Sequence, residues 1–247
     1  MLDFKGLFPS VTAFIAFIIT LLCLFAGTQR HFLNDVDLMT LYTPSGSTDG
    51  VSHDFYSVHL MSYCQGTLRT ADPSAGVTRN VTECSNRTIL FSFDPTQAWP
   101  KANGPELEWQ RVISDDFHAF RTTSRAMAVL YCIGIGATGA ALLVRAWASL
   151  APQNNQPLFE FGFLTLAALS VSIASIIATV IAFEFVALVN AHGKGSSVSA
   201  SYGEQFFGMT WAATALLLVG SVASFVNVFV FGQAASSSAS VAKDIEG

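Results

Sequence analysis

Charged residues are scarce in this chain. Asp, Glu, Lys and Arg make up 12% of its 247 residues, about half the share of a typical soluble domain. Hydrophobic residues reach 51%, so much of the chain needs a solvent other than water. The formal net charge of -5 is too small to indicate a nucleic-acid or anionic-lipid partner. Composition therefore predicts a membrane protein that does not bind nucleic acid.

Recognisable catalytic patterns are also lacking. The sequence shows no nucleophile–base–acid set, paired carboxylate site or phosphate loop. Asp115, Asp116 and His118 cluster just before the second apolar run; a divalent cation could bind there, but a solvated helix face is the favoured interpretation. One stretch, Gly134-Ile135-Gly136-Ala137-Thr138-Gly139, matches the dinucleotide pattern G-x-G-x-x-G. That pattern binds a nucleotide only between a strand and a helix, and here it lies within an apolar run. We interpret it as close helix packing and predict no enzyme, no cofactor and no metal site.

Long hydrophobic runs, by contrast, are abundant. Crossing a bilayer takes roughly 20 apolar residues in a helix, and four runs are long enough: residues 8–27, 126–144, 161–189 and 206–232. The first could instead be a cleaved signal peptide. Its head has one acid and one base, Asp3 and Lys5, and its end lacks the small residues that precede a cleavage site. We therefore predict four transmembrane helices.

The segment between the first two runs, residues 28–125, indicates the orientation. It contains two glycosylation sequons, at Asn80 and Asn86, and two of the four cysteines, Cys64 and Cys84. Glycans and disulfides both form on the lumenal or extracellular side. We therefore predict a Cys64–Cys84 disulfide, an extracellular loop and two cytoplasmic termini. The distribution of Lys and Arg does not support this orientation, but long loops cross membranes largely regardless of charge.

The predicted domain order follows from these runs. It comprises a cytoplasmic N-terminus (1–7), the first span, an extracellular domain ending in an amphipathic helix (28–125), the second span, a cytoplasmic loop (145–160), the third span, a short outer loop (190–205), the fourth span and a serine-rich cytoplasmic tail (233–247). The fold class is a membrane all-α four-helix bundle with a small extracellular β-sheet domain in the first outer loop.

Strand-like runs in the outer loop predict this sheet. They are rich in aromatic and β-branched residues and are separated by Gly and Pro: Val36–Tyr42, Phe55–Tyr63 and Ile89–Phe93. From Trp109 to Phe120 the apolar residues recur at helical spacing, so an amphipathic helix should lead into the second span. The two histidines near the strands, His53 and His59, form no ligand spacing and are expected at the sheet surface.

Small residues recur at four-residue spacing within the spans. Such stripes let helices approach closely in lipid, and we predict helix–helix seams at Gly136, Ala140, Ser170, Ala174, Ala178, Ala182, Gly208, Ala212, Gly220 and Ser224. The Phe-rich face of the fourth span, with Phe225, Phe229 and Phe231, is expected to meet lipid or a partner subunit.

Two polar residues within the spans have alternative interpretations. Glu184 lies in the outer third of the third span. It could serve an ion or proton pathway, or it could anchor the helix at the interface or make a structural hydrogen bond. Asn227 in the fourth span is interpreted as an interhelical hydrogen-bonding residue and less as a ligand.

Several short motifs resemble the fungal Sur/PalI tetraspan family, which includes eisosomal Sur proteins and PalI pH-response regulators, within the claudin-like superfamily. They are Phe55-Tyr56-Ser57-Val58-His59-Leu60-Met61-Ser62-Tyr63-Cys64, Cys84-Ser85, Phe91-Ser92-Phe93-Asp94-Pro95, Tyr202-Gly203 and Thr210-Trp211-Ala212-Ala213. Met61 stands near the place of a tryptophan in claudin loops. The resemblance implies a plasma-membrane protein that organises lateral membrane domains or supports the cell wall.

Three kinds of function are compatible with these features. The first is a structural tetraspan that binds membrane lipids and associates with copies of itself. The second is an accessory subunit of a larger channel, pH-sensing receptor complex or wall-synthesising enzyme. The third, a channel or transporter, has little support because the spans show small and apolar stripes instead of a polar face. The serine-rich tail is a candidate docking segment for a cytoplasmic scaffold.

Overall fold

The computed structural model describes residues 4–29, 33–43, 54–70, 77–86, 117–150, 156–192 and 198–231. The chain divides into two compact units. The helical unit contains Met1–Leu21, Tyr131–Ser172 and Thr210–Gly247, and the sheet unit contains Leu22–Leu130 and Ile173–Met209.

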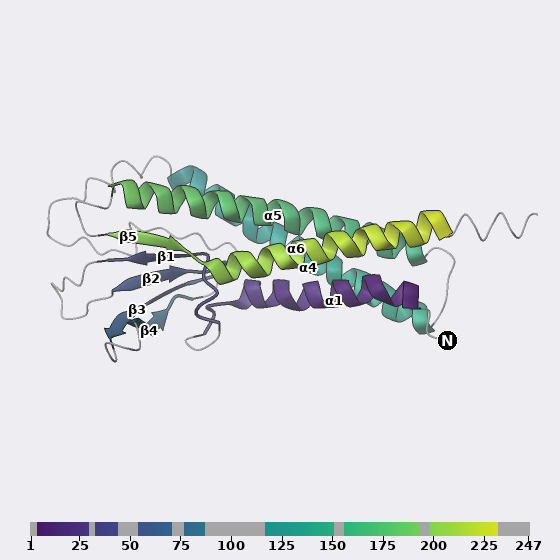
Figure 1. Ribbon diagram of the computed structural model, residues 1–247, viewed down its shortest axis with the longest axis horizontal. Helices are drawn as coiled ribbons and strands as arrows, with labels where there is room; N and C mark the ends of the chain where they lie inside the picture. Colours follow the sequence, from purple (N-terminus) through teal and green to yellow (C-terminus); the bar gives the residue numbers. More distant parts are fainter. Residues whose placement is uncertain are drawn as a thin grey trace, which may run out of the picture. The chain divides into compact units, whose positions relative to one another are not determined.

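Four long helices carry the apolar runs (Figure 1). They are α1 (Phe4–Phe25), α4 (Phe117–Leu150), α5 (Gln156–His192) and α6 (Glu204–Phe225), which a π-helix (Val226–Phe231) continues. Each is long and apolar enough to cross a membrane, which makes this a multi-pass membrane protein. The helices α4 and α5 extend beyond the predicted spans, because a helix satisfies its own backbone hydrogen bonds and can continue past the hydrocarbon layer.

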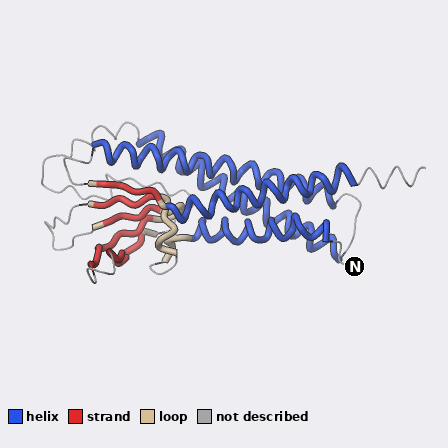
Figure 2. The backbone as a smooth tube through the Cα atoms, viewed as in Figure 1, coloured by secondary structure: helices blue, strands red, loops and turns tan. Residues whose placement is uncertain are grey.

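Within the described residues, five short strands form one antiparallel sheet (Figure 2). They are β1 (Met39–Tyr42), β2 (Phe55–Val58), β3 (Tyr63–Thr70), β4 (Val77–Cys84) and β5 (Ser199–Tyr202), and their order across the sheet is β4-β3-β2-β1-β5. The last strand comes from the connection between α5 and α6 and pairs with β1. The segment expected to be a plain outer loop therefore completes the sheet.

The predicted strand Phe55–Tyr63 is wrong as a single element. It contains β2 and the start of β3, and the chain reverses between them, where the backbone N–H of His59 donates to the Ser62 carbonyl at 2.9 Å. Alternating side chains do not reveal a tight reversal, because both strands of a hairpin have the same period. The predicted strand Ile89–Phe93 and most of the predicted amphipathic helix lie outside the described residues.

One face of the sheet packs against α5 within the sheet unit. The buried cluster consists of Met39, Leu41, Tyr56, Val58, Phe185, Val186, Val189, Val198 and Ala200. Full burial of a large apolar side chain contributes roughly 1.5–3 kcal/mol. This cluster therefore stabilises the packing of the sheet on α5 by apolar burial.

Several small residues of the helices are buried or closely packed. The α5 stripe of Ser170, Ala174, Ala178 and Ala182 is buried. Gly134 of α4 also packs closely, since a Cβ there would overlap the side chain of Val171, and Gly220 of α6 lies against the Thr12 hydroxyl of α1.

The predicted seams at Gly136 and Gly208 need correction. A Cβ at either position would meet nothing within 4 Å, and Ala212 is also exposed while Ala140 is half-buried. The reason is the helix period. Two residues turn the chain by about 200°, so Gly136 faces away from the neighbour that Gly134 contacts. Gly208 is likewise displaced from the fully buried Thr210.

Candidate functional site

The predicted disulfide is confirmed and pins two neighbouring strands. Cys64 of β3 and Cys84 of β4 are directly opposite in the antiparallel register, and their sulfur atoms are bonded at 2.04 Å. Next to the bond, the Ser85 backbone N–H donates to the Tyr63 carbonyl at 2.8 Å. The Tyr63 N–H donates in turn to the Ser85 hydroxyl at 3.0 Å. The end of the β3–β4 ladder is thus held covalently and by hydrogen bonds.

Gly27, just after the end of α1, contacts the β2–β3 reversal beside the disulfide. This glycine has a φ of 68°, a conformation that L side chains rarely adopt. A Cβ on Gly27 would overlap the imidazole of His59. The Gly27 carbonyl accepts a hydrogen bond from the Ser62 hydroxyl at 2.9 Å and lies 3.3 Å from the Cys64 sulfur. The β2–β3 reversal therefore closes directly over the end of the first helix.

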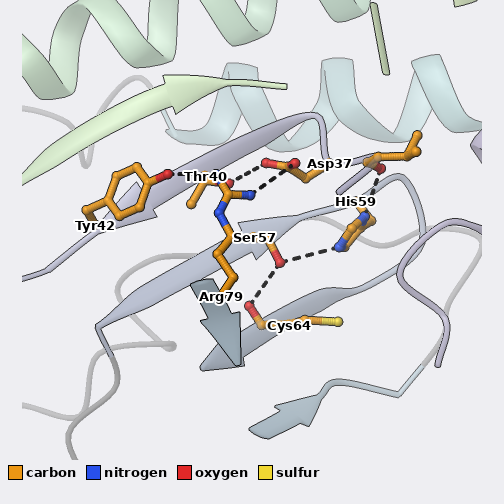
Figure 3. A network of polar contacts seen from close by, with 8 residues as sticks. Asp37, Thr40, Tyr42, Ser57, His59, Cys64 and Arg79 are labelled. Carbon is orange, nitrogen blue, oxygen red and sulfur yellow. Dashed lines mark hydrogen bonds and ion pairs between the residues drawn. The ribbon is translucent and has the colours of Figure 1, made fainter. Parts of the chain in front are cut away.

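His59 is buried, contrary to the prediction of a surface position. Its exposure is 2%, and its Nδ1 lies 3.0 Å from the Val36 carbonyl. A carbonyl oxygen only accepts hydrogen bonds, so Nδ1 carries the proton of the neutral ring. Nε2 is then the acceptor that faces the Ser57 hydroxyl at 3.4 Å. Figure 3 shows this contact and the second one of Ser57, to the Cys64 carbonyl.

Burial lowers the pKa of His59 below its ordinary value of 6.5. The negative charge of Asp37 and the bond to the Val36 carbonyl oppose this shift, while the positive charge of Arg79 adds to it. The unfolded chain, with a normal imidazole, consequently binds a proton more readily than the folded chain between the two pKa values.

Acidification is expected to destabilise the sheet unit through His59. Its contribution is fully present above pH 6.5 and is lost as the pH falls from there toward the folded pKa, with a slope of at most about 1.4 kcal/mol per pH unit for one group. Unfolding midpoints measured from pH 7.5 to 5 should show this fall. His59→Asn, whose amide can still donate to Val36, should flatten it. An unchanged slope in the variant would assign the pH dependence to other groups.

Arg79 connects the outermost strand β4 with β1 (Figure 3). Its guanidinium donates to the Tyr42 hydroxyl at 2.6 Å and lies 3.6 Å from the Asp37 carboxylate. It also stacks over the rings of Tyr42 and Phe55, at 5.7 and 5.8 Å from their centroids. Gly66 of β3 lies between these strands, and a Cβ there would come within 2.8 Å of the Phe55 ring. Because Gly66 has no side chain, the Phe55 ring can pack against the backbone at this position.

Asp37 is the central acceptor of this second cluster. Its carboxylate is buried, accepts a hydrogen bond from the Thr40 hydroxyl and pairs with Arg79. Arg79 is partly exposed, so removing it would leave the buried Asp37 carboxylate without its charged partner, which is costly for a buried charge. The cluster therefore specifies one arrangement of β1 relative to β4.

These polar groups form a structural clamp and not a reaction centre. Ser57 and His59 resemble a hydroxyl–imidazole pair, but exposures of 1% and 2% leave no access for a substrate. Within the described part of the chain, no three His, Cys, Asp or Glu side chains lie close enough to hold a metal ion. The disulfide, the hydrogen bonds of Gly27 and the ion pair of Arg79 together connect the strands of the sheet with one another and with the end of α1.

The remaining predicted residues make none of the clamp contacts given above. Asn80 is exposed in β4, and Asn86 is exposed just beyond the end of that strand. Glu184 is exposed on α5, and Asn227 is half-buried in the π-helix.

A further polar cluster, in the helical unit, was not among the site residues predicted from the sequence. Glu160 of α5 is buried and pairs with Arg145 of α4 at 3.7 Å, and the Ser10 hydroxyl of α1 donates to it at 3.5 Å. Glu160 belongs to the segment 145–160, which the sequence predicts as a cytoplasmic loop, and the structure places it in α5. One signal in the sequence could have identified this pair. Arg145 directly follows the second apolar run and Glu160 directly precedes the third, so a base and an acid stand at the same end of two neighbouring spans.

Comparisons with known proteins give one family. No curated protein matches the chain. A family model described as the SUR7/PalI family matches residues 6–223, which include all five strands and nearly all of the four helices. Four spans, with most of an antiparallel sheet between the first two, also fit the claudin-like layout that the motifs implied. This membrane protein therefore belongs to the SUR7/PalI family.

Proposed function

We propose that this protein is a structural, non-catalytic tetraspan of the plasma membrane whose copies associate laterally. Its sheet unit faces the cell exterior and both termini face the cytoplasm. In this role it contributes to eisosome-like lateral domains and to the integrity of the cell wall. Membrane lipids and further copies of the chain are its partners.

The sheet unit supports the extracellular placement. A disulfide is stable in an oxidising compartment and rare in the cytosol, and Cys64–Cys84 is formed here. The two sequons lie beside it on the surface, at Asn80 and Asn86. Both features require the same side of the membrane, which supports one orientation for the whole chain.

The outward face of α6 supports lateral association and is the observation that carries the proposal. This helix is the least buried of the four. Its exposed positions include Gly208, Ala212 and Ala215, spaced by four and three residues along one side. Lipid gives no hydrophobic driving force between helices, so close backbone contact at small residues is what favours their association. A second copy's helix is the occupant that we propose.

Large apolar side chains on other faces favour a second candidate function. Leu143 and Trp147 of α4 and Phe225 and Phe229 near the end of α6 are exposed. A larger channel, receptor or wall-synthesising enzyme could bind there, with this chain as its accessory subunit. The cytoplasmic tail, a candidate scaffold-docking segment, lies outside the described residues.

Gly208→Leu is expected to weaken self-association. Nothing within 4 Å would meet the new side chain inside the chain itself, so folding should be preserved while the approach of another helix is blocked. The measurement is the mass of the particle extracted in gentle detergent, with all co-purifying proteins identified. Wild type should give several copies, and the variant should shift at least tenfold toward single copies at equal concentration.

Gly136→Leu is the matched control, because Gly136 is equally open but lies on α4. It should leave the particle mass unchanged. A wild-type particle with one copy beside a stoichiometric larger protein would instead establish the accessory-subunit function. A single copy without any partner would contradict both.

A further inference from the structure

Among the strands that the structure describes, β4 and β5 are the outermost two of the sheet. An edge strand carries unpaired backbone N–H and C=O groups that can pair with a strand of another molecule. In a protein whose copies gather in one membrane, an open edge would let sheets join indiscriminately. How each edge is protected therefore decides which surfaces join the copies.

The β5 edge is closed by a side chain from α5. Asn190 accepts a hydrogen bond from the Ala200 backbone N–H at 2.9 Å and donates to the Ala200 carbonyl at 3.0 Å. These are the two bonds that a neighbouring strand would make. Ala200 is opposite Leu41 of β1 in the register, and the groups that bond Asn190 face the other side. The amide of Asn190 thus stands in for one residue of a sixth strand.

The β4 edge has a different feature. In the described sheet, β4 has one strand neighbour, β3. Asn80 lies within β4 and is exposed, and its carbonyl faces β3, where a Cβ on Gly66 would overlap it. Backbone groups alternate between the two sides of a strand, so the backbone groups of the residues flanking Asn80 point away from β3. The sequon hydroxyl, on Thr82, donates to the Gln65 carbonyl at 3.0 Å.

We propose that an N-linked oligosaccharide on Asn80 shields the β4 edge, as Asn190 closes the β5 edge. Copies then meet through their membrane-spanning helices and not through their sheets. The proposal rests on the extracellular placement given above.

The modification itself needs a lipid-linked oligosaccharide diphosphate as donor. The amide nitrogen of Asn80 bonds to the anomeric carbon of the sugar, the bond from that carbon to the diphosphate breaks, and the lipid diphosphate leaves while the amide loses one proton. Because Thr82 is engaged with β3 in the folded sheet, the transfer precedes the pairing of β4 with β3.

Asn80→Gln tests this role in the full-length protein from a glycosylating eukaryotic host. Glycosidase treatment should shift the mass of wild type and of Asn86→Gln, the matched control at the sequon outside the strand. Asn80→Gln should lack one glycan, form particles heavier than wild type, and show at least tenfold slower hydrogen exchange of β4 amides. Asn80→Lys should also lack the glycan but keep the wild-type number of copies per particle, since a lysine on an edge strand discourages pairing.

Two results would overturn the proposal. Absence of a glycan on Asn80 would remove the shield. A glycan on Asn80 of the wild type, together with an unchanged number of copies per particle and unchanged amide exchange in Asn80→Gln, would show that the edge needs no glycan. The second result would leave the proposed lateral association intact, because that proposal is tested separately by Gly208→Leu in the membrane-spanning helix α6.

Discussion

Alanine at Gly203 is expected to prevent β5 from joining the sheet. Gly203 follows β5, and its backbone N–H donates to the Leu38 carbonyl at 3.1 Å. A Cβ there would overlap the backbone carbonyl of Asp37, and a backbone atom cannot move aside as a flexible side chain can. We expect a loss of roughly 3 kcal/mol, at the upper end of the range for overpacking, and release of β5 from β1.

The measurement is thermal unfolding in detergent combined with protease digestion of the sheet unit. Gly162→Ala is the matched control, since a Cβ on this α5 glycine would meet nothing within 4 Å. The control should unfold at the wild-type midpoint, while Gly203→Ala should unfold earlier and be cleaved near β5. Equal midpoints for the two variants would show that the contact with Asp37 is not as close as described.

Cys64→Ser is expected to unfold the sheet unit in a large fraction of molecules. The disulfide closes a segment with a sequence separation of 20 residues, which corresponds to roughly 3 kcal/mol in the chain-entropy model. The change also leaves a hydroxyl in a fully buried position. Reduced surface delivery and faster proteolysis are the expected results.

Cys132→Ser is the control for this prediction, because Cys132 is a free, half-buried cysteine of α4. It should be delivered and digested like wild type. Normal delivery and unchanged protease resistance of Cys64→Ser would mean that the clamp of His59, Asp37 and Arg79 holds the sheet without the disulfide.

The spans and the disulfide could be predicted because each depends on a local or compositional signal. An uncharged run of about 20 residues has few alternatives to a membrane helix. Two cysteines in one loop leave one pairing within that loop. Most of the sheet depends on distant partners, which a single sequence does not show. Ser199–Tyr202 is too short and too polar to predict a strand, and its place beside β1 is set by α5 through Asn190.

The clamp could not be predicted for a related reason. His59 is polar within an apolar stretch, so a surface position was the reasonable expectation. Its burial depends on Gly27, which is 32 residues earlier in the chain and has no side chain that would overlap the ring. The sequence predicts that small residues in the spans form helix–helix seams, but it does not show which side of a helix faces a neighbour. The helix period then separates the packed Gly134 from the open Gly136.

The central claim is a four-span protein with its disulfide-locked sheet outside the cell. Single cysteines at Ser199 in β5 and at Leu150, the last residue of α4, test it most directly in a chain whose Cys23 and Cys132 are replaced by serine. Both positions are exposed. The account predicts that a membrane-impermeant maleimide labels Ser199→Cys in intact cells and labels Leu150→Cys only after permeabilisation. Labelling of Leu150→Cys in intact cells, with Ser199→Cys protected, would contradict it.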